Sequence, residues 1–318
     1  MDFKENISEA YERIKRDIKR TSLEYSSSLS QRLGAEVYLK WENEQLTGSF
    51  KIRGALNKIR FLSMDQKRRG IVSASTGNHG LGLSYACQLE RVGLTLFLPT
   101  TASEEKSKKL SELNVSLILH GSSCEKAELH ARRIAQETDR VYISPYNDWD
   151  IVFGQGTVGF EILEDLPDVD DVIVPVGGGG LISGIAGYLK YIHPKIRIFG
   201  VEPENSQFMA ASIKARRIVE IEEKETLADA VAGGIEPGSI TFPLCQKYVE
   251  EFLTVEESLI KSSMSLLFEE HQKIVEGAGA LSLSGLMRAC KTFKGRKVVL
   301  VVSGGNISQG TFNKIIHV

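Results

Sequence analysis

Short apolar runs alternate with longer segments of helical periodicity along most of the chain. Near the N-terminus, Tyr11, Ile14 and Ile18 recur at helical spacing, and Ser8 stands where an N-cap would be. The pattern therefore predicts an opening amphipathic helix over residues 8–18, ahead of the alternating elements.

The alternation predicts strands and helices in turn. The predicted strands span residues 37–41, 70–74, 94–98, 115–119, 141–144, 172–176, 196–201 and 297–302. The predicted helices span residues 50–62, 78–89, 104–113, 125–138, 157–166, 181–191, 256–275 and 278–289. The stretch 232–242 is too rich in glycine and proline for the interior of an element, so we expect a surface loop there. Continuously apolar strands that alternate with helices are typical of an α/β fold with parallel sheets, in which ligands bind beyond the carboxyl ends of the strands.

Composition and charge narrow the class of protein. Of the 318 residues, 42% are hydrophobic and 25% charged, which is ordinary for a globular protein, and no stretch approaches a membrane span. A formal net charge of −2 offers no positive field for a nucleic acid or an anionic membrane, so we expect neither partner. The four cysteines form no CxxC pair, and the N-terminus lacks the apolar core of a signal peptide. We therefore expect reduced thiols and a cytoplasmic protein.

Four successive glycines, Gly177, Gly178, Gly179 and Gly180, connect the predicted strand 172–176 to the next helix. Backbone N–H groups can converge on an anion there, and the helix N-terminus adds the positive end of its dipole. The run lacks both the lysine of a Walker loop and GxGxxG spacing, so it favours a compact phosphorylated cofactor over a nucleoside triphosphate or a dinucleotide. The alternative is a tight turn without a ligand.

A second glycine pattern, from Gly154 to Gly159, does match GxGxxG. Only the short apolar run 151–153 precedes it, and no second strand ends in an acidic residue at the distance that a dinucleotide site requires. We interpret the match as the start of a helix with close packing. A nicotinamide-dependent dehydrogenase rests on this match alone and is kept only as a third alternative.

A lysine, Lys51, stands in the first turn of the predicted helix 50–62, and Ser49 is placed to cap that helix. The helix dipole and partial burial both disfavour an ammonium there and lower the pKa of Lys51 toward that of a usable amine nucleophile. Such a lysine, next to the aromatic Phe50, can form a Schiff base. Most lysines are solvated, so this segment alone leaves an ordinary surface lysine as the stronger interpretation.

Polar groups also follow two other predicted strands. Ser75, Thr76, Asn78 and His79 lie between a strand and a helix, where hydroxyls, an amide and backbone N–H groups are placed to hold a carboxylate. We interpret His79 as a positioning residue rather than a general base. Ser303 follows the last predicted strand, where a simple turn explains it as well as a site does.

Together these segments resemble the serine/threonine dehydratase branch of the fold-type II pyridoxal-phosphate enzymes, a family that includes serine racemase. The motifs that carry the resemblance are Thr47-Gly48-Ser49-Phe50-Lys51, Ser75-Thr76-Gly77-Asn78-His79-Gly80, Gly177-Gly178-Gly179-Gly180, Glu276-Gly277-Ala278-Gly279 and Ser303-Gly304-Gly305-Asn306. The family has a two-domain fold of the tryptophan synthase β type. The resemblance thus implies a large cofactor-binding domain of residues 1–65 and 147–318, a small mobile domain of residues 66–146, and a cofactor between them.

The resemblance also implies how pyridoxal 5′-phosphate would be held. Lys51 would form the Schiff base, and Phe50 would flank the pyridine ring. The phosphate would lie on the glycines 177–180, Asn78 would bond the ring hydroxyl, and Ser303 would face the ring nitrogen. A neutral hydroxyl at that nitrogen makes the cofactor a weaker electron sink than a carboxylate would, which suits β-elimination.

For the substrate, the resemblance implies that Ser75, Thr76 and His79 receive the carboxylate, partly through main-chain amides. The released Lys51 amine would remove the α-proton, and the cofactor phosphate is a candidate acid for the leaving hydroxide.

Two positions depart from the family pattern. Thr76 stands where the racemase carries a serine that protonates the opposite face, and its methyl group crowds that face, so racemisation is not expected to dominate. Glu202 aligns with a divalent-cation ligand of the racemase, but Phe208 replaces the second carboxylate, and Glu204 is the only obvious substitute. We therefore expect no tight metal site. The alternative to a metal ligand at position 202 is that Glu202 is a surface acid.

The sequence as a whole predicts a pyridoxal-phosphate-dependent lyase. Its substrate would be a small β-hydroxy amino acid, L-threonine, L-serine or a relative, converted to a 2-oxo acid and ammonia. The alternatives are an amino-acid racemase on the same scaffold and, more distantly, a non-catalytic ligand-binding protein. By analogy with the family we expect a homodimer.

Overall fold

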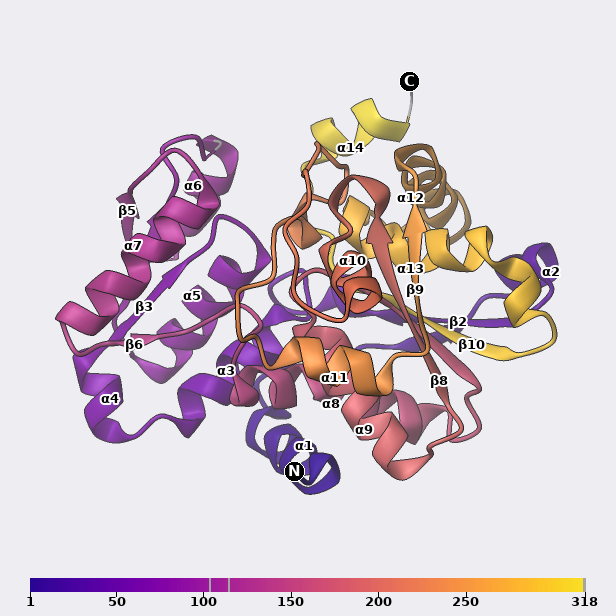
Figure 1. Cartoon of the computed structure of the whole chain (residues 1–318), viewed down its shortest axis with the longest axis horizontal. Coiled ribbons are helices and arrows are strands. Elements are labelled where there is room, and N and C mark those ends of the chain that lie inside the picture. Colours follow the sequence, from indigo (N-terminus) through magenta and orange to yellow (C-terminus); the bar gives the residue numbers. More distant parts are fainter. Residues whose placement is uncertain (103, 114, 317–318) are drawn as a thin grey trace.

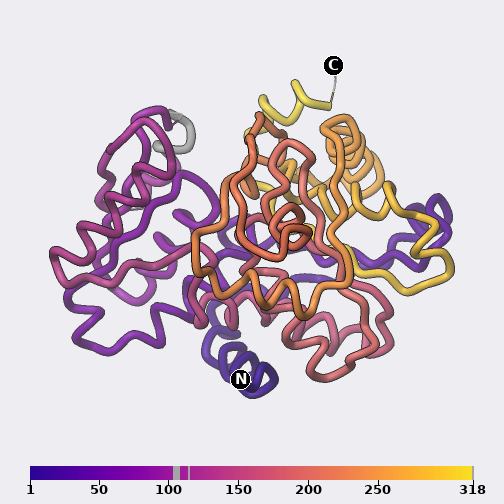
Figure 2. Tube along the Cα trace, in the orientation of Figure 1, coloured from indigo at the N-terminus to yellow at the C-terminus, as the bar shows by residue number. Residues whose placement is uncertain are grey.

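The computed structural model describes residues 1–102, 104–113 and 115–316. The chain forms a six-stranded and a four-stranded sheet, which lie in separate parts of the molecule (Figure 1). Figure 2 follows the chain from the N-terminal indigo segments through the smaller sheet and back into the larger part, where the chain ends in yellow.

The larger sheet has the strand order β1-β2-β10-β7-β8-β9. Its strands are β1 Leu23–Tyr25, β2 Glu36–Trp41, β7 Asp171–Pro175, β8 Arg197–Pro203, β9 Glu251–Val255 and β10 Lys297–Val302. All neighbouring pairs are parallel except β1 and β2, which are antiparallel. The last strand along the chain, β10, therefore pairs with β2 from the N-terminal region, as the indigo and yellow ribbons in Figure 1 show.

Helices cover both faces of the larger sheet. They are α1 Phe3–Ile14, α2 Ser27–Leu33, α8 Trp149–Asp165, α9 Gly180–Ile192, α10 Phe208–Ala215, α11 Thr241–Tyr248, α12 Glu257–His271, α13 Gly277–Arg288 and α14 Gln309–Ile316. Val299 and Val301 of β10 pack in a core with α1, α8 and α9, whereas Leu300 and Val302 pack with α2, α12 and α13. Successive side chains of a strand point to opposite faces, so a strand buried on both faces must be apolar throughout.

The smaller sheet has the strand order β5-β4-β3-β6, and all its pairs are parallel. Its elements are β3 Ile71–Ala74, β4 Leu94–Leu98, β5 Ser116–Leu119 and β6 Val141–Tyr142, with helices α3 Lys51–Phe61, α4 Met64–Arg69, α5 Asn78–Glu90, α6 Glu104–Ser111 and α7 Cys124–Glu137. One core joins α3 and α5 to this sheet and also takes in Ile14 and Ile151, while Ala127, Ala131 and Ala135 of α7 pack on the other face. The domain boundaries at residues 65/66 and 146/147 stay a prediction.

The first helix lies nearer the N-terminus than predicted. α1 begins at Phe3 because Asp2 caps it, with Oδ1 of Asp2 accepting a hydrogen bond from the Glu5 amide at 3.0 Å. Ser8 therefore lies inside the helix and is not its cap. Ile18 lies beyond the end of α1 and is buried there, so it is apolar because it belongs to the core and not because the helix extends to it.

The helix that contains the GxGxxG pattern also begins earlier than predicted. Oδ1 of Asp148 accepts hydrogen bonds from the amides of Asp150 (2.8 Å) and Ile151 (3.3 Å), so α8 starts at Trp149. The pattern thus lies within a helix and not at a strand-to-helix turn, which removes the only support for a dinucleotide site. Its close packing is confirmed, because a Cβ on Gly154 would lie 2.6 Å from Cα of Gly54 in α3.

Among the described residues, no helix is both long and apolar enough to cross a lipid bilayer.

Candidate active site

The carboxyl ends of neighbouring strands lead to one cavity. Gly177 follows β7 and Ser303 follows the adjacent strand β10, while Lys51 comes after β2 on the other side of β10. Asn78 begins α5, after β3 of the smaller sheet. In parallel sheets these ends meet at the same edge, so residues far apart in sequence are brought together.

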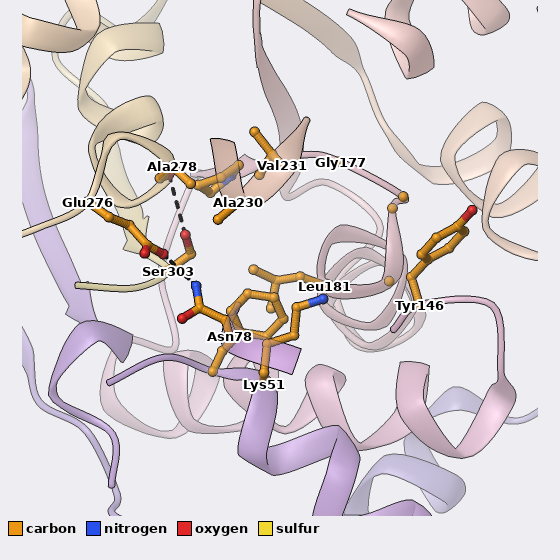
Figure 3. A pocket seen from close by; sticks show the side chains of 15 residues that line it. Lys51, Asn78, Tyr146, Gly177, Leu181, Ala230, Val231, Glu276, Ala278 and Ser303 are labelled. Carbon is orange, nitrogen blue, oxygen red and sulfur yellow. Dashed lines mark hydrogen bonds between the residues drawn. The ribbon is translucent and has the colours of Figure 1, made fainter. Parts of the chain in front are cut away.

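The cavity contains every residue predicted to bind the cofactor. Its lining comprises Phe50, Lys51, Asn78, Tyr146, Pro175, Gly177, Gly178, Gly179, Gly180, Leu181, Ala230, Val231, Glu276, Ala278 and Ser303. Figure 3 shows the side chains of Lys51, Asn78 and Ser303 around the same space, with Tyr146 near the glycine loop. The contacts that each residue would make with a bound cofactor remain proposals.

The glycine loop is a cradle of bare backbone. Gly179 is the N-cap of α9 and has a φ of +84°, in the left-handed region that favours glycine. A Cβ on Gly177 would lie 2.7 Å from the carbonyl oxygen of Val231, and one on Gly178 would lie 2.3 Å from Cδ1 of Tyr146. The loop therefore has no room for side chains, and it places backbone N–H groups at a helix N-terminus, where an anion is stabilised.

Gly178→Ala is expected to weaken binding of pyridoxal phosphate about tenfold, since the new methyl group must displace either the Tyr146 ring or the loop itself. Fluorescence titration of the cofactor-free protein measures this affinity. Gly310→Ala is the matched control, because a Cβ there would meet no atom within 4 Å. Equal affinities of the two variants would contradict this role of the loop.

Lys51 is the first residue of α3, and its Nζ donates a hydrogen bond to the carbonyl of Pro145 at 3.1 Å. Burial lowers the pKa of Lys51 to about 8, although the negative charge of Glu276 acts in the opposite direction. A substantial fraction of this amine is therefore neutral near pH 8 and able to act as a nucleophile. The N-cap of α3 is Phe50, so the predicted cap at Ser49 is wrong.

Backbone contacts tie the lysine segment to the segment around Ser303. The Phe50 amide donates to the carbonyl of Ser303 at 3.2 Å, and Ser49 forms a β-bridge with Gly304. The hydroxyl of Ser303 is buried and donates to the carbonyl of Ala278 at 3.3 Å. Lys51 and Ser303 are thus held in fixed relation on one side of the cavity.

The three residues predicted to bind the substrate carboxylate lie beside the cavity rather than in its lining, as far as the described residues show. Oγ of Ser75 accepts a hydrogen bond from the Gly77 amide at 3.2 Å, and Thr76 lies in the same loop ahead of α5. Nε2 of His79 lies 3.3 Å from the carbonyl of Ile143, and burial, followed by the charge of Lys51, lowers the pKa of His79 to about 3. His79 is therefore a neutral imidazole at physiological pH, and its role as a positioning residue stays a prediction.

Two lining residues with polar side chains, Tyr146 and Glu276, received no role from the sequence. Oη of Tyr146 accepts a hydrogen bond from the Glu236 amide at 2.9 Å. Tyr146, whose ring lies against Gly178, is thereby joined to the loop predicted at 232–242. Glu276 is 5% exposed, and its carboxylate accepts a hydrogen bond from Asn78. The position of Glu276 in a motif of the resemblance was the one signal that marked it, whereas Tyr146 carried none.

Glu202 is not a surface acid. Its side chain is buried, and its two carboxylate oxygens accept hydrogen bonds from the amides of Met209 (2.9 Å) and Ala210 (2.7 Å) at the start of α10. Burial raises the pKa of Glu202 to about 8, although these two hydrogen bonds act in the opposite direction. Among the described residues, no group of three or more His, Cys, Asp or Glu side chains could hold a metal ion.

Comparison with known proteins identifies the family. The sequence profile of the family described as pyridoxal-phosphate dependent enzyme matches residues 14–304. The chain belongs to this family. The resemblance inferred from the motifs is thereby confirmed, and so is pyridoxal phosphate as the cofactor of this enzyme.

The relatives of this pyridoxal-phosphate enzyme include named ammonia-lyases. The L-threonine ammonia-lyase of Thermotoga maritima is 44% identical, over 98% of this chain and 78% of its own length. The catabolic L-threonine dehydratase of Escherichia coli is 38% identical, over 98% of this chain and 95% of its own length.

Solved structures share the whole fold. The serine racemase of maize superposes with a TM-score of 0.92 at 32% identity, covering 99% of this chain and 96% of its own. Threonine deaminase isoform 2 of Solanum lycopersicum superposes with a TM-score of 0.93 at 32% identity, covering 99% and 92%. The predicted α/β architecture of a fold-type II enzyme is confirmed.

The cavity fits the cofactor of the family. Pyridoxal phosphate needs a site for a phosphate dianion, an amine to attach its aldehyde and polar partners for its ring. The glycine loop presents bare backbone at the N-terminus of α9, and the Lys51 amine, the Asn78 amide and the Ser303 hydroxyl line the same cavity. All four groups therefore border one cavity, as a site for this cofactor requires.

Proposed function

We propose that this enzyme eliminates the β-hydroxyl group of L-threonine, L-serine or a related β-hydroxy amino acid. The α-proton and the β-hydroxyl leave as water, and hydrolysis of the resulting enamine gives ammonia and a 2-oxo acid. The observation that carries the proposal is the shared cavity of the buried Lys51 amine, the bare glycine loop and the Ser303 hydroxyl. The names of relatives at 44% and 38% identity support the same reaction.

Lys51 would serve twice. Its Nζ would hold the cofactor through the aldehyde, and the same amine, when free, would accept the α-proton of the substrate. The pKa of about 8 suits a base that must be neutral to accept a proton and must release it again near neutral pH. Its position at the start of α3, where no acidic side chain lies in the first turn, adds to the stability of the neutral form.

The cofactor, when bound, supplies an aldehyde for attachment of amino acids and a conjugated ring that takes up the electron pair left at the α-carbon. Ser303 would face the ring nitrogen with a hydroxyl, which carries no charge to hold that nitrogen protonated. Phe50 would cover the ring, since the Lys51 amine already lies 5.2 Å from the centre of the Phe50 side chain.

The substrate carboxylate would bind at the start of α5. The first N–H groups of a helix have no partner within the helix and attract an anion. Ser75 and Thr76 lie in the loop just ahead of this helix, and the neutral His79 is anchored by the Ile143 carbonyl beneath it. These residues would orient the substrate with its α-carbon toward Lys51.

Racemisation is the second candidate activity, because the maize serine racemase shares the fold at a TM-score of 0.92. Inversion requires a proton donor on the face of the substrate opposite Lys51. Thr76 would be that donor, and its branched side chain restricts the approach of its hydroxyl. We therefore propose elimination as the main reaction.

A substrate screen tests this proposal. L-Threonine and L-serine are expected to release ammonia and a 2-oxo acid in equal amounts, while the amino acid that remains keeps its L configuration. Coupled assays follow both products, and chiral chromatography follows the remaining amino acid. Inversion as fast as ammonia release would favour the racemase, and binding of amino acids without turnover would favour the ligand-binding protein.

We further propose that the enzyme is a homodimer in the cytoplasm. The resemblance to the family supports the dimer. Cys87 and Cys245 are buried free thiols, which fits a reducing compartment.

A further inference from the structure

The side chain of Asn78 is held by hydrogen bonds at both ends. Its Oδ1 accepts from Nδ2 of Asn306 at 2.6 Å, and its Nδ2 donates to Oε1 of Glu276 at 2.6 Å. Nδ2 of Asn306 also donates to the carbonyl of Thr47 at 2.8 Å. These contacts form one chain from the backbone near Lys51, through Asn306 and Asn78, to Glu276.

The chain of contacts fixes which atom of each amide faces which neighbour. The backbone carbonyl of Thr47 can only accept a hydrogen bond, so the atom of Asn306 beside it must be the amide nitrogen. The same nitrogen donates to Asn78, which must therefore offer its oxygen on that side. The nitrogen of Asn78 consequently points to Glu276, whose carboxylate accepts the bond.

An amide nitrogen carries two N–H groups, and Glu276 takes one of them. Asn78 lines the cavity, so its second N–H is available to an acceptor there. If the amide were rotated, a carbonyl oxygen would face that acceptor and repel it. The orientation of Asn78 thus decides whether the ring oxygen of a cofactor is stabilised as an anion or destabilised.

We propose that Glu276 is a positioning residue that, as a hydrogen-bond acceptor, orients Asn78 so that an N–H group meets the ring oxygen of pyridoxal phosphate. The inference rests on the proposed function, in which Asn78 contacts that oxygen. Glu276 is suited to the task because it is only 5% exposed and stands at the start of α13, a helix packed against the larger sheet. The backbone of Gly304 also confines it, since a Cβ there would lie 2.2 Å from Oε1 of Glu276.

Glu276 also carries a charge that acts on Lys51, and the test must separate the two effects. Glu276→Gln removes the charge and keeps an acceptor for Asn78. Asn306 still holds the oxygen of Asn78, so the nitrogen of Asn78 faces the new Gln side chain and can donate to its carbonyl oxygen. Glu276→Leu removes both the acceptor and the charge. The pair of variants therefore isolates the hydrogen bond.

The experiment measures the dissociation constant of pyridoxal phosphate and the visible absorption band of the lysine-bound cofactor in the purified holoenzyme. Glu276→Leu is expected to weaken binding about tenfold or more and to shift the band. The bond to the carboxylate is the stronger of the two that hold the Asn78 amide, and without it the amide can turn about its bond to Asn306 and withdraw its N–H from the ring oxygen. Glu276→Gln is expected to bind within about threefold of wild type, with the band in place. A purely structural role would lower the melting temperature without moving the band.

Two results would overturn the inference. One is wild-type affinity and an unshifted band in Glu276→Leu, and the other is a Gln variant as impaired as the Leu variant, which would assign the effect to charge. Should Glu276→Leu fail to fold, Asn306→Ala decides, because it leaves the bond between Asn78 and Glu276 in place. A band in its wild-type position is then expected, and a shifted band would assign the orientation of Asn78 to Asn306. A wild-type protein without a lysine-bound band would instead defeat the proposed function.

Discussion

Replacing Lys51 with alanine is expected to lower the rate of ammonia release from L-threonine by at least about 10³-fold and to abolish the absorption band of the lysine-bound cofactor. The same Nζ would attach the cofactor and move the α-proton, so one substitution removes both. Among the described residues, no other lysine lines the cavity to take over either task. Single-turnover assays and absorption spectra of the purified variant measure the two losses.

Lys58→Ala is the matched control for this prediction. Lys58 lies on the same helix and pairs with Asp148 (2.7 Å) and Asp150 (2.8 Å) outside the cavity. It is expected to keep the cofactor band and most of the activity, although loss of the ion pairs lowers stability. A Lys51→Ala variant that retained both the band and turnover would refute the role of Lys51.

The second large effect concerns stability. Glu161→Ala is expected to lower the free energy of unfolding by about 3–5 kcal/mol, because it leaves the buried Lys40 ammonium without a carboxylate partner and removes one of the two carboxylates that hold Arg53. Oε2 of Glu161 accepts from Nζ of Lys40 at 2.6 Å, and Oε1 accepts from Nη1 of Arg53 at 2.8 Å. The Arg53 guanidinium also bonds both oxygens of Glu42, and all four side chains have no solvent exposure.

This buried network bears on the active site because Arg53 lies two residues after Lys51 on α3. It anchors the start of α3 to η1 Glu42–Glu44 and to α8, which carries Glu161. Loss of Glu161 is therefore expected to loosen the helix that presents the lysine as well as to destabilise the fold.

Urea unfolding followed by circular dichroism measures the stability of the Glu161→Ala variant. Asp65→Ala is the control, since it breaks only exposed contacts between Asp65 and Arg68 (3.2 Å) and Arg69 (3.4 Å), worth less than about 1 kcal/mol. Similar losses of unfolding free energy in the two variants would show that the buried ion pairs of Glu161 do not stabilise the start of α3.

Burial explains which parts of the fold were predictable from sequence. Both bounds of β4 and β10 match the predicted strands 94–98 and 297–302, because strands buried on both faces are apolar along most of their length, here at all positions except Thr95 and Lys297. Short elements with few buried residues, such as β1 and α4, produced no periodic pattern to detect. The start of a helix is set by its N-cap. The N-caps Asp2 and Asp148 were not identified from the sequence, so the predicted starts of α1 and α8 lie too far along the chain.

The candidate site was predictable where backbone requirements mark the sequence. A run of four glycines and a lysine at a helix start are local signals, and the structure brings both to one cavity. Glu161 and Arg53 gave no such signal, because a charged residue in a helix is usually solvated, and only the fold shows them paired in the interior. Tyr146 likewise reaches the glycine loop through tertiary packing alone.

Reductive trapping shows directly which lysine carries the cofactor. Treating the holoenzyme with borohydride fixes the cofactor to its lysine, and peptide mapping by mass spectrometry then locates the modified residue. A single pyridoxyl adduct is expected on Lys51, which directly follows Ser49-Phe50 in the sequence. An adduct on another lysine, or none at all, would contradict it.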